Sequence, residues 1–332
     1  MGDPVTIMDV AKAAGVSPAT VTHALNGKRP VSEITRKRVL AAVETLGYVP
    51  SWNASRMKSH SSGIIGCLAA DITETFVNQI VRGIEQGLSG GQHSLFFVSG
   101  IEFGNDLKKA YHFLKSHKVE GILFCHHLPI WKEFNLDTQN SDIPIVSVNM
   151  DTPGMISVIP DNTTGGYQAA EHLYGCGMRH PAMICGPEDR LSVQDRLQGF
   201  SSRVTELQMQ MPTLQYYGNY DYDHGFQATT ELMKEYPETD GIFCANDYIA
   251  AGCIAGLQKM GYEVPSQVRV VGFDNRDFSS FWNVPITTFE LPLQEMGILG
   301  VSILKQVIST GSYATTKHVL QSKLIPRQSS RG

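Results

Sequence analysis

The sequence predicts an α/β protein with two parts: a small all-α domain at the N-terminus and a larger domain built on parallel sheets. Three observations lead to this prediction. The first sixty residues contain three helical patterns. From about residue 61, short apolar runs alternate with helical stretches, which is the rhythm of open sheets covered on both faces. The length of 332 residues suits two or three domains, and an apolar fraction of 42% is enough for their cores.

The first two helices are predicted from apolar spacing and capping residues. In the first, apolar residues three and four positions apart share one face: Ile7, Val10, Ala11 and Ala14. Thr6 and Asp9 have the spacing of a capping box at its start. The second helix is predicted to begin at Ser17, a favourable N-cap, with Pro18 in the first helical position.

The third helix is predicted to begin near Ser32 and to end at Gly47, with an apolar face of Val39, Ala42, Val43 and Leu46. In the first two helices and their turn, Ala11, Gly15 and Val21 stand at offsets of four and six. A small residue lets two helices approach, a glycine permits a tight turn, and a branched residue fills the shared core. This is the helix-turn-helix arrangement, whose second helix enters the major groove of DNA.

Charge is distributed unevenly along the chain. The first sixty residues carry eight Lys and Arg against four Asp and Glu, a net charge of +4. Because the whole chain has a net charge of −5, the remaining residues carry −9. A basic segment on a larger acidic body indicates a nucleic-acid-binding arm on a soluble domain, and chance is the alternative explanation.

The larger domain is predicted from alternating strands and helices. The apolar runs expected as strands are 64–69, 95–98, 121–124, 145–148, 182–185, 242–244 and 268–273. The helices expected between them are 76–88, 105–117, 164–175, 193–207, 223–235 and 247–260. A strand-like stretch at 318–325 follows near the end of the chain. Ligands of such sheets bind beyond the carboxyl ends of the strands, where this chain places polar side chains: Asp71, Asp161, Arg190, Asn246, Asp247 and Asp274.

Several other classes of protein are disfavoured. The N-terminus has no signal-peptide pattern, and no run of about 18 apolar residues occurs, so we expect a cytoplasmic protein. The six cysteines form no C-x-x-C pair and are expected to be reduced packing residues rather than a zinc site. Cys125-His126-His127 lacks a further ligand or base at a recognisable spacing. We therefore expect no metal, no cofactor and no enzymatic activity.

Residues 5–59 closely resemble the DNA-binding domain of the lactose-repressor (LacI/GalR) family, and the resemblance continues through the chain. The matching pieces are D-V-A at 9–11, A-G-V-S at 14–17, T-V at 20–21, L-N at 25–26, V-S at 31–32, T-R at 35–36 and G-Y-V-P at 47–50. The resemblance implies a sensor domain like a periplasmic sugar-binding protein, with two lobes and a ligand cleft between them. The implied boundaries are a helix-turn-helix domain at 1–48, a hinge at 49–60, a first lobe at 61–160 plus 291–320 and a second lobe at 161–290.

By this resemblance, Pro18, Ala19 and His23 face the bases. Pro18 and Ala19 offer only shape or contact with a thymine methyl group, so His23 would make the main polar contact. A surface histidine that touches phosphate or solvent is the alternative. Ser17, Thr20 and Thr22 are candidates for phosphate contact through their hydroxyls, which fixes register without reading sequence.

Residues 50–58 match the family's hinge helix, which is too short to be stable alone and is expected to fold when two copies pair over the minor groove. Met57 stands where the family usually has a leucine that wedges between base pairs and kinks the duplex. Arg56 and Lys58 would add charge near the phosphates, and a plain solvated linker is the alternative for this segment.

The implied effector site takes residues from several loops: Phe76, Asp161, Arg190, Ser192, Arg196, Tyr220, Asn246 and Asp274. Carboxylate, amide, guanidinium and aromatic groups together suit a polyol. Alternatives remain for three positions. Asp247 would cap the following helix, Arg190 would pair with a neighbouring acid, and Phe76 would belong to the core. A sugar or sugar acid is the favoured effector, and a purine or nucleoside is the alternative.

These features predict a ligand-responsive transcriptional repressor that binds a pseudo-palindromic operator as a homodimer. Ligand would bias the tilt of the two lobes and thereby the pairing of the hinge helices. A solute-binding protein or an enzyme on the same two-lobed fold is the alternative from another class. The helix-turn-helix and the missing secretion signal disfavour the first, and the missing nucleophile, metal set and cofactor motif disfavour the second.

Overall fold

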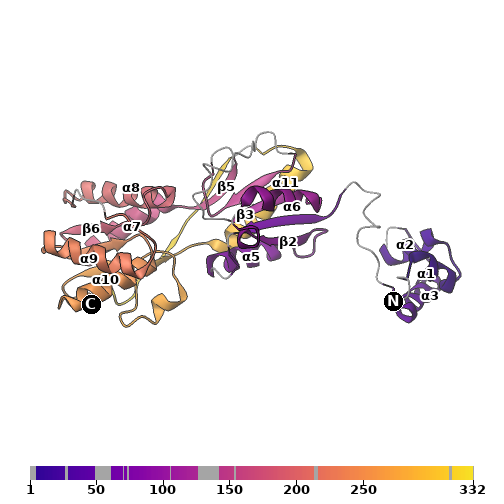
Figure 1. Cartoon of the computed structure of the whole chain (residues 1–332), viewed down its shortest axis with the longest axis horizontal. Helices are drawn as coiled ribbons and strands as arrows, with labels where there is room; N and C mark the ends of the chain where they lie inside the picture. Colours follow the sequence, from indigo (N-terminus) through magenta and orange to yellow (C-terminus); the bar gives the residue numbers. More distant parts are fainter. Residues whose placement is uncertain are drawn as a thin grey trace. The chain divides into compact units, whose positions relative to one another are not determined.

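The computed structural model describes residues 5–26, 29–48, 61–69, 71–72, 75–104, 106–125, 142–152, 155–212, 216–313 and 316–331. The chain divides into two compact units, Met1–Gly63 and Ile64–Gly332. Both units appear in Figure 1. The predicted hinge residues Met57 and Lys58 lie outside the described residues.

The described residues of the N-terminal unit form three helices: α1 (Ile7–Ala14), α2 (Pro18–Asn26) and α3 (Glu33–Leu46). The predicted caps are confirmed. The Asp9 carboxylate accepts from the Thr6 amide at 2.8 Å, and the Ser17 hydroxyl accepts from the Thr20 amide at 3.1 Å. Gly15 turns the chain with a φ of 62°, a left-handed conformation that glycine adopts without strain. The three helices share one small core of Val10, Ala11, Ala14, Val21, Ala24, Val39 and Ala42.

Among the described residues, the first sheet of the larger unit has six strands, all parallel, in the order β10-β5-β4-β3-β1-β2. The strands are β1 (Ile64–Ala69), β2 (Ser94–Ser99), β3 (Gly121–Cys125), β4 (Ile145–Val148), β5 (Ile156–Pro160) and β10 (Lys317–Leu320). Its helices are α5 (Thr75–Leu88), the short 3-10 helix η1 (Gly100–Phe103), α6 (Leu107–Ser116) and α11 (Leu293–Thr310). Helices α5 and α11 pack on one face and α6 on the other, and each face has its own apolar core. We call this sheet with its helices the first lobe.

The second sheet has the parallel order β6-β7-β8 and is extended at both edges by single bridges to Tyr216 and Thr287. Its strands are β6 (Pro181–Ile184), β7 (Gly241–Cys244) and β8 (Arg269–Val271). Its helices are α7 (Asn162–Gly175), α8 (Leu191–Glu206), α9 (Tyr222–Glu235), α10 (Asp247–Lys259) and the 3-10 helix η4 (Asp277–Ser280). Helices α7 and α8 lie on one side of this sheet, and α9 and α10 on the other (Figure 1). We call this sheet with its helices the second lobe.

The end of the chain departs from the sequence-based expectation. The predicted strand-like stretch at 318–325 is wrong as a single strand, because β10 pairs with β5 whereas β11 (Lys323–Ile325) pairs antiparallel with β9 (Thr288–Glu290). The chain thus changes sheets between β10 and β11. Helix α11 was not predicted either. Its buried residues nevertheless recur at helical spacing along one stripe: Leu293, Met296, Gly297, Gly300, Val301 and Leu304.

Three helix pairs approach so closely that glycines of each helix lie against the backbone of the other. The pairs are α5 with α11 at Gly83 and Gly297, α7 with α8 at Gly166 and Gly199, and α9 with α10 at Gly225 and Gly252. In the second pair, a Cβ atom on Gly199 would lie 1.9 Å from the carbonyl oxygen of Thr163. A Cβ on Gly166 would lie 2.0 Å from the carbonyl oxygen of Arg196. These contacts fix α8, which carries Arg196, against α7.

Candidate functional sites

The outer face of α2 carries the residues predicted to read bases. Pro18 and Thr22 are four residues apart, as are Ala19 and His23, so all four share one side of the helix. Ala19 is exposed and the other three are half-buried, whereas Val21 faces the core. The Thr22 hydroxyl donates to the Pro18 carbonyl at 3.0 Å, so its proton is already used within the helix.

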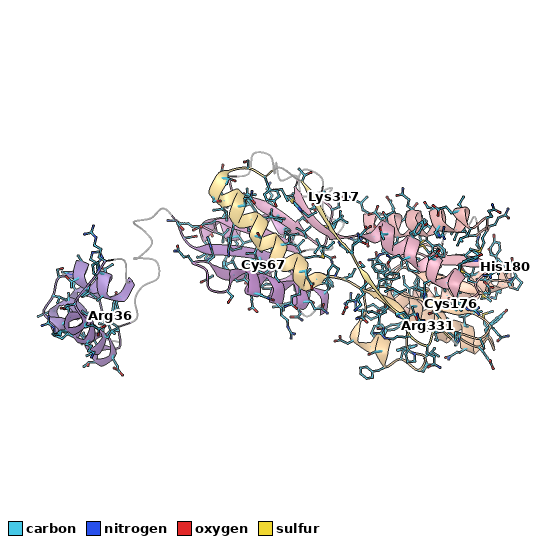
Figure 2. All side chains as sticks on the ribbon, turned by 180° about the vertical axis from the view of Figure 1, so that it is seen from behind. Arg36, Cys67, Cys176, His180, Lys317 and Arg331 are labelled. Carbon is cyan, nitrogen blue, oxygen red and sulfur yellow. The ribbon has the colours of Figure 1, made fainter. Side chains whose placement is uncertain are left out.

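Basic side chains lie on the same unit. Helix α3 carries Arg36, Lys37 and Arg38, and α1 carries Lys12 in its last turn. Figure 2 shows Arg36 on this unit. The Asp9 carboxylate is held by Thr6, which lowers the pKa of Asp9 through hydrogen bonds. The unit therefore combines exposed basic side chains on α1 and α3 with a helix α2 whose outer face offers few functional groups. Exposed basic groups suit phosphate contact, which fixes register without reading bases.

Five of the predicted effector residues meet in the second lobe around the phenol of Tyr220. Ser192 hydrogen-bonds to that phenol, and Arg190, Arg196 and Asp274 lie close enough to influence its ionisation. Burial raises the pKa of Tyr220, and Arg196, Ser192 and Arg190 oppose this rise while Asp274 adds to it. The structure thus gathers side chains from α8, from the loop before α9 and from the loop after β8.

Two features shape the rim of this cluster. A Cβ on Gly186 would lie 2.4 Å from the Tyr220 ring, so glycine is required for the ring to pack against the loop after β6. The Arg190 guanidinium lies 3.7 Å from the carboxylate of Asp189. Pairing with such a neighbouring acid is the alternative to effector contact for Arg190. The Arg190 side chain is 22% exposed, so solvent still reaches it.

Arg196 is buried at the base of the cluster and holds it together. Its Nε donates to the Asn162 side-chain oxygen at 2.9 Å, and its Nη1 donates to the Ala245 carbonyl at 2.5 Å. Nη2 lies 3.5 Å from the Asp274 carboxylate, and the guanidinium stacks 3.7 Å over the Phe273 ring. Arg196 thereby ties α7, the loop after β7 and Asp274 into one unit.

Asp274 sits in a strained turn. Its φ is 99° and that of Asn275 is 49°, although neither residue is glycine. Such conformations cost about 1–3 kcal/mol each and persist where the surroundings over-determine them, often at functional sites. Burial raises the pKa of the Asp274 carboxyl against the effects of Arg196 and Arg276. Its side chain remains 16% exposed, so a carboxylate held by two arginines is presented to solvent.

The remaining predicted residues also have structural duties. Asn246 caps α10 by accepting from the Ile249 amide at 2.8 Å, so the alternative that Asp247 is this cap is wrong. Asp161 caps α7, and its carboxylate also accepts from Gln321 at 2.7 Å. Burial works to raise the pKa of Asp161, but hydrogen bonds outweigh it, and the pKa is lowered.

Phe76 joins the core of the first lobe and is 9% exposed. Its ring also lies 5.5 Å from the guanidinium of Arg276, which belongs to the turn that carries Asp274. Phe76 is therefore a core residue, and it also lies beside the turn of the predicted effector site.

Asp247 is a buried carboxyl whose role was not anticipated. It accepts from the Thr288 hydroxyl at 2.6 Å and from the Arg276 amide at 2.7 Å, directly behind the Asp274 turn. It has no exposed surface, and this burial raises its pKa to about 8. The only sequence signal was its position after a strand, which pointed equally to a ligand contact or a helix cap.

We expect Asp247→Asn to remove a pH dependence of stability. Because the pKa of Asp247 in the folded chain exceeds its ordinary value of 3.8, the folded state binds the extra proton between these two pH values. Its contribution to stability is therefore complete below about pH 4 and is lost as pH rises towards 8. Urea unfolding at pH 5 and pH 8 should show the variant gaining stability relative to the wild type at the higher pH. Asp277→Asn, at an exposed position, is the control. If the stability of Asp247→Asn relative to the wild type changed no more between pH 5 and pH 8 than that of Asp277→Asn, the assignment would be contradicted.

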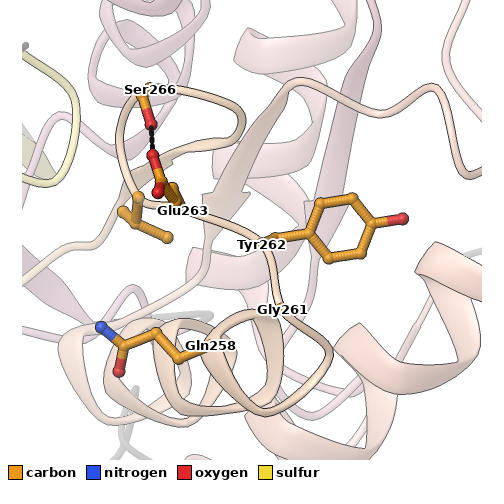
Figure 3. Close-up of a pocket in the computed structure, with 6 residues that line it drawn as sticks. Gln258, Gly261, Tyr262, Glu263 and Ser266 are labelled. Carbon is orange, nitrogen blue, oxygen red and sulfur yellow. Dashed lines mark hydrogen bonds between the residues drawn. The ribbon is translucent and has the colours of Figure 1, made fainter.

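A hollow of about 400 Å³ lies elsewhere on the second lobe, at the C-terminal end of α10 (Figure 3). It is lined by Gln258, Gly261, Tyr262, Glu263, Val264 and Ser266. It opens widely to solvent, and Ser266 donates to the Glu263 carboxylate at 2.8 Å within it. None of the predicted effector residues lines it, so it is separate from the Tyr220 cluster.

Two features are absent from the described part of the chain. No group of three or more His, Cys, Asp or Glu side chains there is placed to hold a metal ion. No helix among those residues combines the length and apolar character needed to cross a membrane.

Two family models match the chain. One, described as periplasmic binding proteins and sugar binding domain of LacI family, matches residues 62–328. The other, described as bacterial regulatory proteins, lacI family, matches residues 6–51. The chain belongs to the LacI family. This assignment confirms the predicted fold class and identifies a DNA-binding transcriptional repressor with an effector-binding domain.

Similar LacI-family proteins match over almost their whole length. The transcriptional repressor PurR of Aliivibrio fischeri (strain MJ11) is 30% identical over 98% of both chains. The ribose operon repressor of Halalkalibacterium halodurans is 29% identical over 98% of this chain and 97% of its own. A crystal structure of the lac repressor dimer bound to operator and the anti-inducer ONPF is 27% identical, with a TM-score of 0.85, over 99% of this chain and 100% of that one. LacI-family repressors bind operator DNA as dimers, and this chain contains both domains of the family.

Proposed function

We propose that this repressor controls a carbohydrate-utilisation operon and that its effector is a sugar or sugar acid bound at the Tyr220 cluster. The observation that carries the proposal is the solvent-reachable Asp274 carboxylate, fixed by Arg196 beside the phenol of Tyr220. A carboxylate and an arginine bind adjacent hydroxyls, and an aromatic ring packs against a sugar face. The similarity to a ribose operon repressor supports this effector class. The protein would act in the cytoplasm without enzymatic turnover.

A purine or nucleoside is the second candidate effector. The ring of Tyr220 offers a stacking surface, and the Asp274 carboxylate would accept from a base N–H. A set of D-ribose, D-glucuronate and hypoxanthine, added separately to an operator-binding assay, separates the two classes. A response to hypoxanthine alone would favour the purine.

The proposed DNA interface divides among three segments. Residues 1–48 would place α2 in the major groove, with His23 as the polar base contact and Ser17 and Thr20 near phosphates. Residues 49–60 would pair over the minor groove, with Met57 as the wedge and Lys58 near the backbone. The lobes, at 61–160 plus 291–320 and at 161–290, would transmit effector binding to this pairing through their relative tilt.

Selection of bound sequences from random duplex DNA is the test of the DNA interface. We expect a pseudo-palindrome and an affinity that falls steeply with salt, because lysine and arginine contacts release counterions. His23→Ala should weaken binding to the selected operator by about 1–3 kcal/mol, or roughly 5- to 150-fold, and relax specificity at one base pair. The exposed His112, in the first lobe, supplies the matched control as His112→Ala. A flat salt response, or no enriched motif with any of the three small molecules present, would contradict the proposal.

A further inference from the structure

The segment that follows β11 is embedded in the second lobe. Ser329 and Ser330 have no exposed surface. The Ser329 carbonyl accepts from the Val270 amide at 2.8 Å, and the Ser329 hydroxyl donates to the Val270 carbonyl at 2.6 Å. The Ser329 hydroxyl also accepts from the Thr287 amide at 2.8 Å. These contacts fix the tail against β8. Arg327, two residues before Ser329, therefore has little freedom to move.

Arg327 extends its guanidinium from this tail to the turn that carries Asp274. Its Nη2 donates to the side-chain oxygen of Asn275 at 2.6 Å. Its Nη1 donates to the Ser279 hydroxyl at 3.0 Å and to the Ile286 carbonyl at 2.8 Å. The fork of one guanidinium thus joins both ends of the segment 275–279, a geometry that lysine cannot reproduce.

The segment held by Arg327 includes the strained turn. Asn275 has a left-handed backbone and directly follows Asp274, which is left-handed too. Ser279 donates its hydroxyl proton to the Arg276 carbonyl at 2.6 Å, which closes the other side of the turn. Two consecutive residues in conformations that disfavour L side chains need external restraint, and Arg327 supplies it through contacts with the side chains of Asn275 and Ser279.

We propose that Arg327 is a positioning residue of the effector site, which sets the orientation of the Asp274 carboxylate through Asn275 without touching the effector. This inference rests on the proposed role of Asp274 in effector binding. The strand β10 belongs to the first sheet, and Arg327 lies two residues beyond β11. The chain that links the lobes therefore also carries the side chain that restrains the turn.

Hydrogen exchange of the full chain, followed by mass spectrometry, tests the restraint without any ligand. Arg327→Met removes the donors and the charge but keeps an unbranched apolar stem. We expect the amides of 274–276 to exchange about tenfold faster in this variant, the change that loss of hydrogen bonds to a charged group implies. Arg327→Lys should give an intermediate rate. The matched control is Arg331→Met on the same tail, since Arg331 is exposed on the second lobe (Figure 2).

Titration with D-glucuronate gives the second readout. Arg327→Met should weaken its binding about tenfold and leave operator affinity unchanged, while Arg331→Met should change neither. If the wild-type chain fails to bind D-glucuronate, that result counts against this sugar acid as the effector, and the exchange rates still decide the role of Arg327. Equal exchange in the Arg327→Met and Arg331→Met variants would overturn the inference. Uniformly faster exchange across β6 and β7 in both Arg327 variants would also overturn it, because the tail would then hold the lobe and not the turn.

Discussion

Asp274→Ala is expected to abolish the response to effector while operator binding stays intact. The carboxylate is the group that two arginines present to solvent, and its loss removes charged hydrogen bonds worth about 1.5–3 kcal/mol each. We therefore expect effector affinity to fall at least about 100-fold. The measurement is operator binding by fluorescence anisotropy at increasing concentrations of each small molecule in the set.

Two further variants make the Asp274 experiment specific. Asp274→Asn keeps the shape of the side chain and should lose the response as well, which separates loss of charge from loss of packing around Arg196. Asp277→Ala removes an exposed acid from the same turn and should respond like the wild type. A normal response from Asp274→Ala would show that the effector binds elsewhere on the chain.

Gly199→Ala is expected to destabilise the second lobe by about 3 kcal/mol or more. The added methyl group would overlap the carbonyl oxygen of Thr163, and because that atom belongs to the backbone of α7, the two helices must separate. Separation would also displace Arg196 from its hydrogen bond with Asn162. Urea unfolding followed by circular dichroism measures the loss.

Gly175→Ala is the matched control for this comparison. Gly175 is the last residue of α7, and a Cβ there meets no atom within 4 Å. Alanine favours a helix over glycine by up to about 1 kcal/mol, so this variant should be neutral or slightly more stable than the wild type. Equal effects of the two substitutions would mean that the close approach of α7 and α8 has no energetic consequence.

Local pattern predicted most of the fold. The helices α7 to α10 lie within two residues of their expected ranges, because apolar periodicity and polar capping residues such as Asn246 are local signals. The cluster of Arg190, Ser192, Arg196, Tyr220 and Asp274 could also be predicted, since parallel strands bring their carboxyl ends to one edge and the family resemblance named the positions.

Long-range contacts account for what sequence reasoning missed. Arg327 reaches Asn275 across 52 positions, and Asp247 meets Thr288 across 41. No periodicity or motif relates residues at such separations. Helix α11 is an exception, because the helical spacing of Leu293, Met296, Val301 and Leu304 is a local signal that the prediction overlooked. Only its partners, α5 and the strands β3 and β4, come from much earlier in the chain.

The placement of α11 and β10 has a consequence for the order in which the protein can fold during synthesis. Strands β1 to β5 are made first, yet the helix that covers one face of their sheet and the strand that closes its edge come from 293–320. Gly300 of α11 packs directly on Leu123 and Val148. A nascent chain that ends before α11 therefore carries a sheet with one apolar face only partly covered, the kind of surface that attracts chaperones. The lobe that the ribosome begins first reaches its final form only after most of the other lobe has been made.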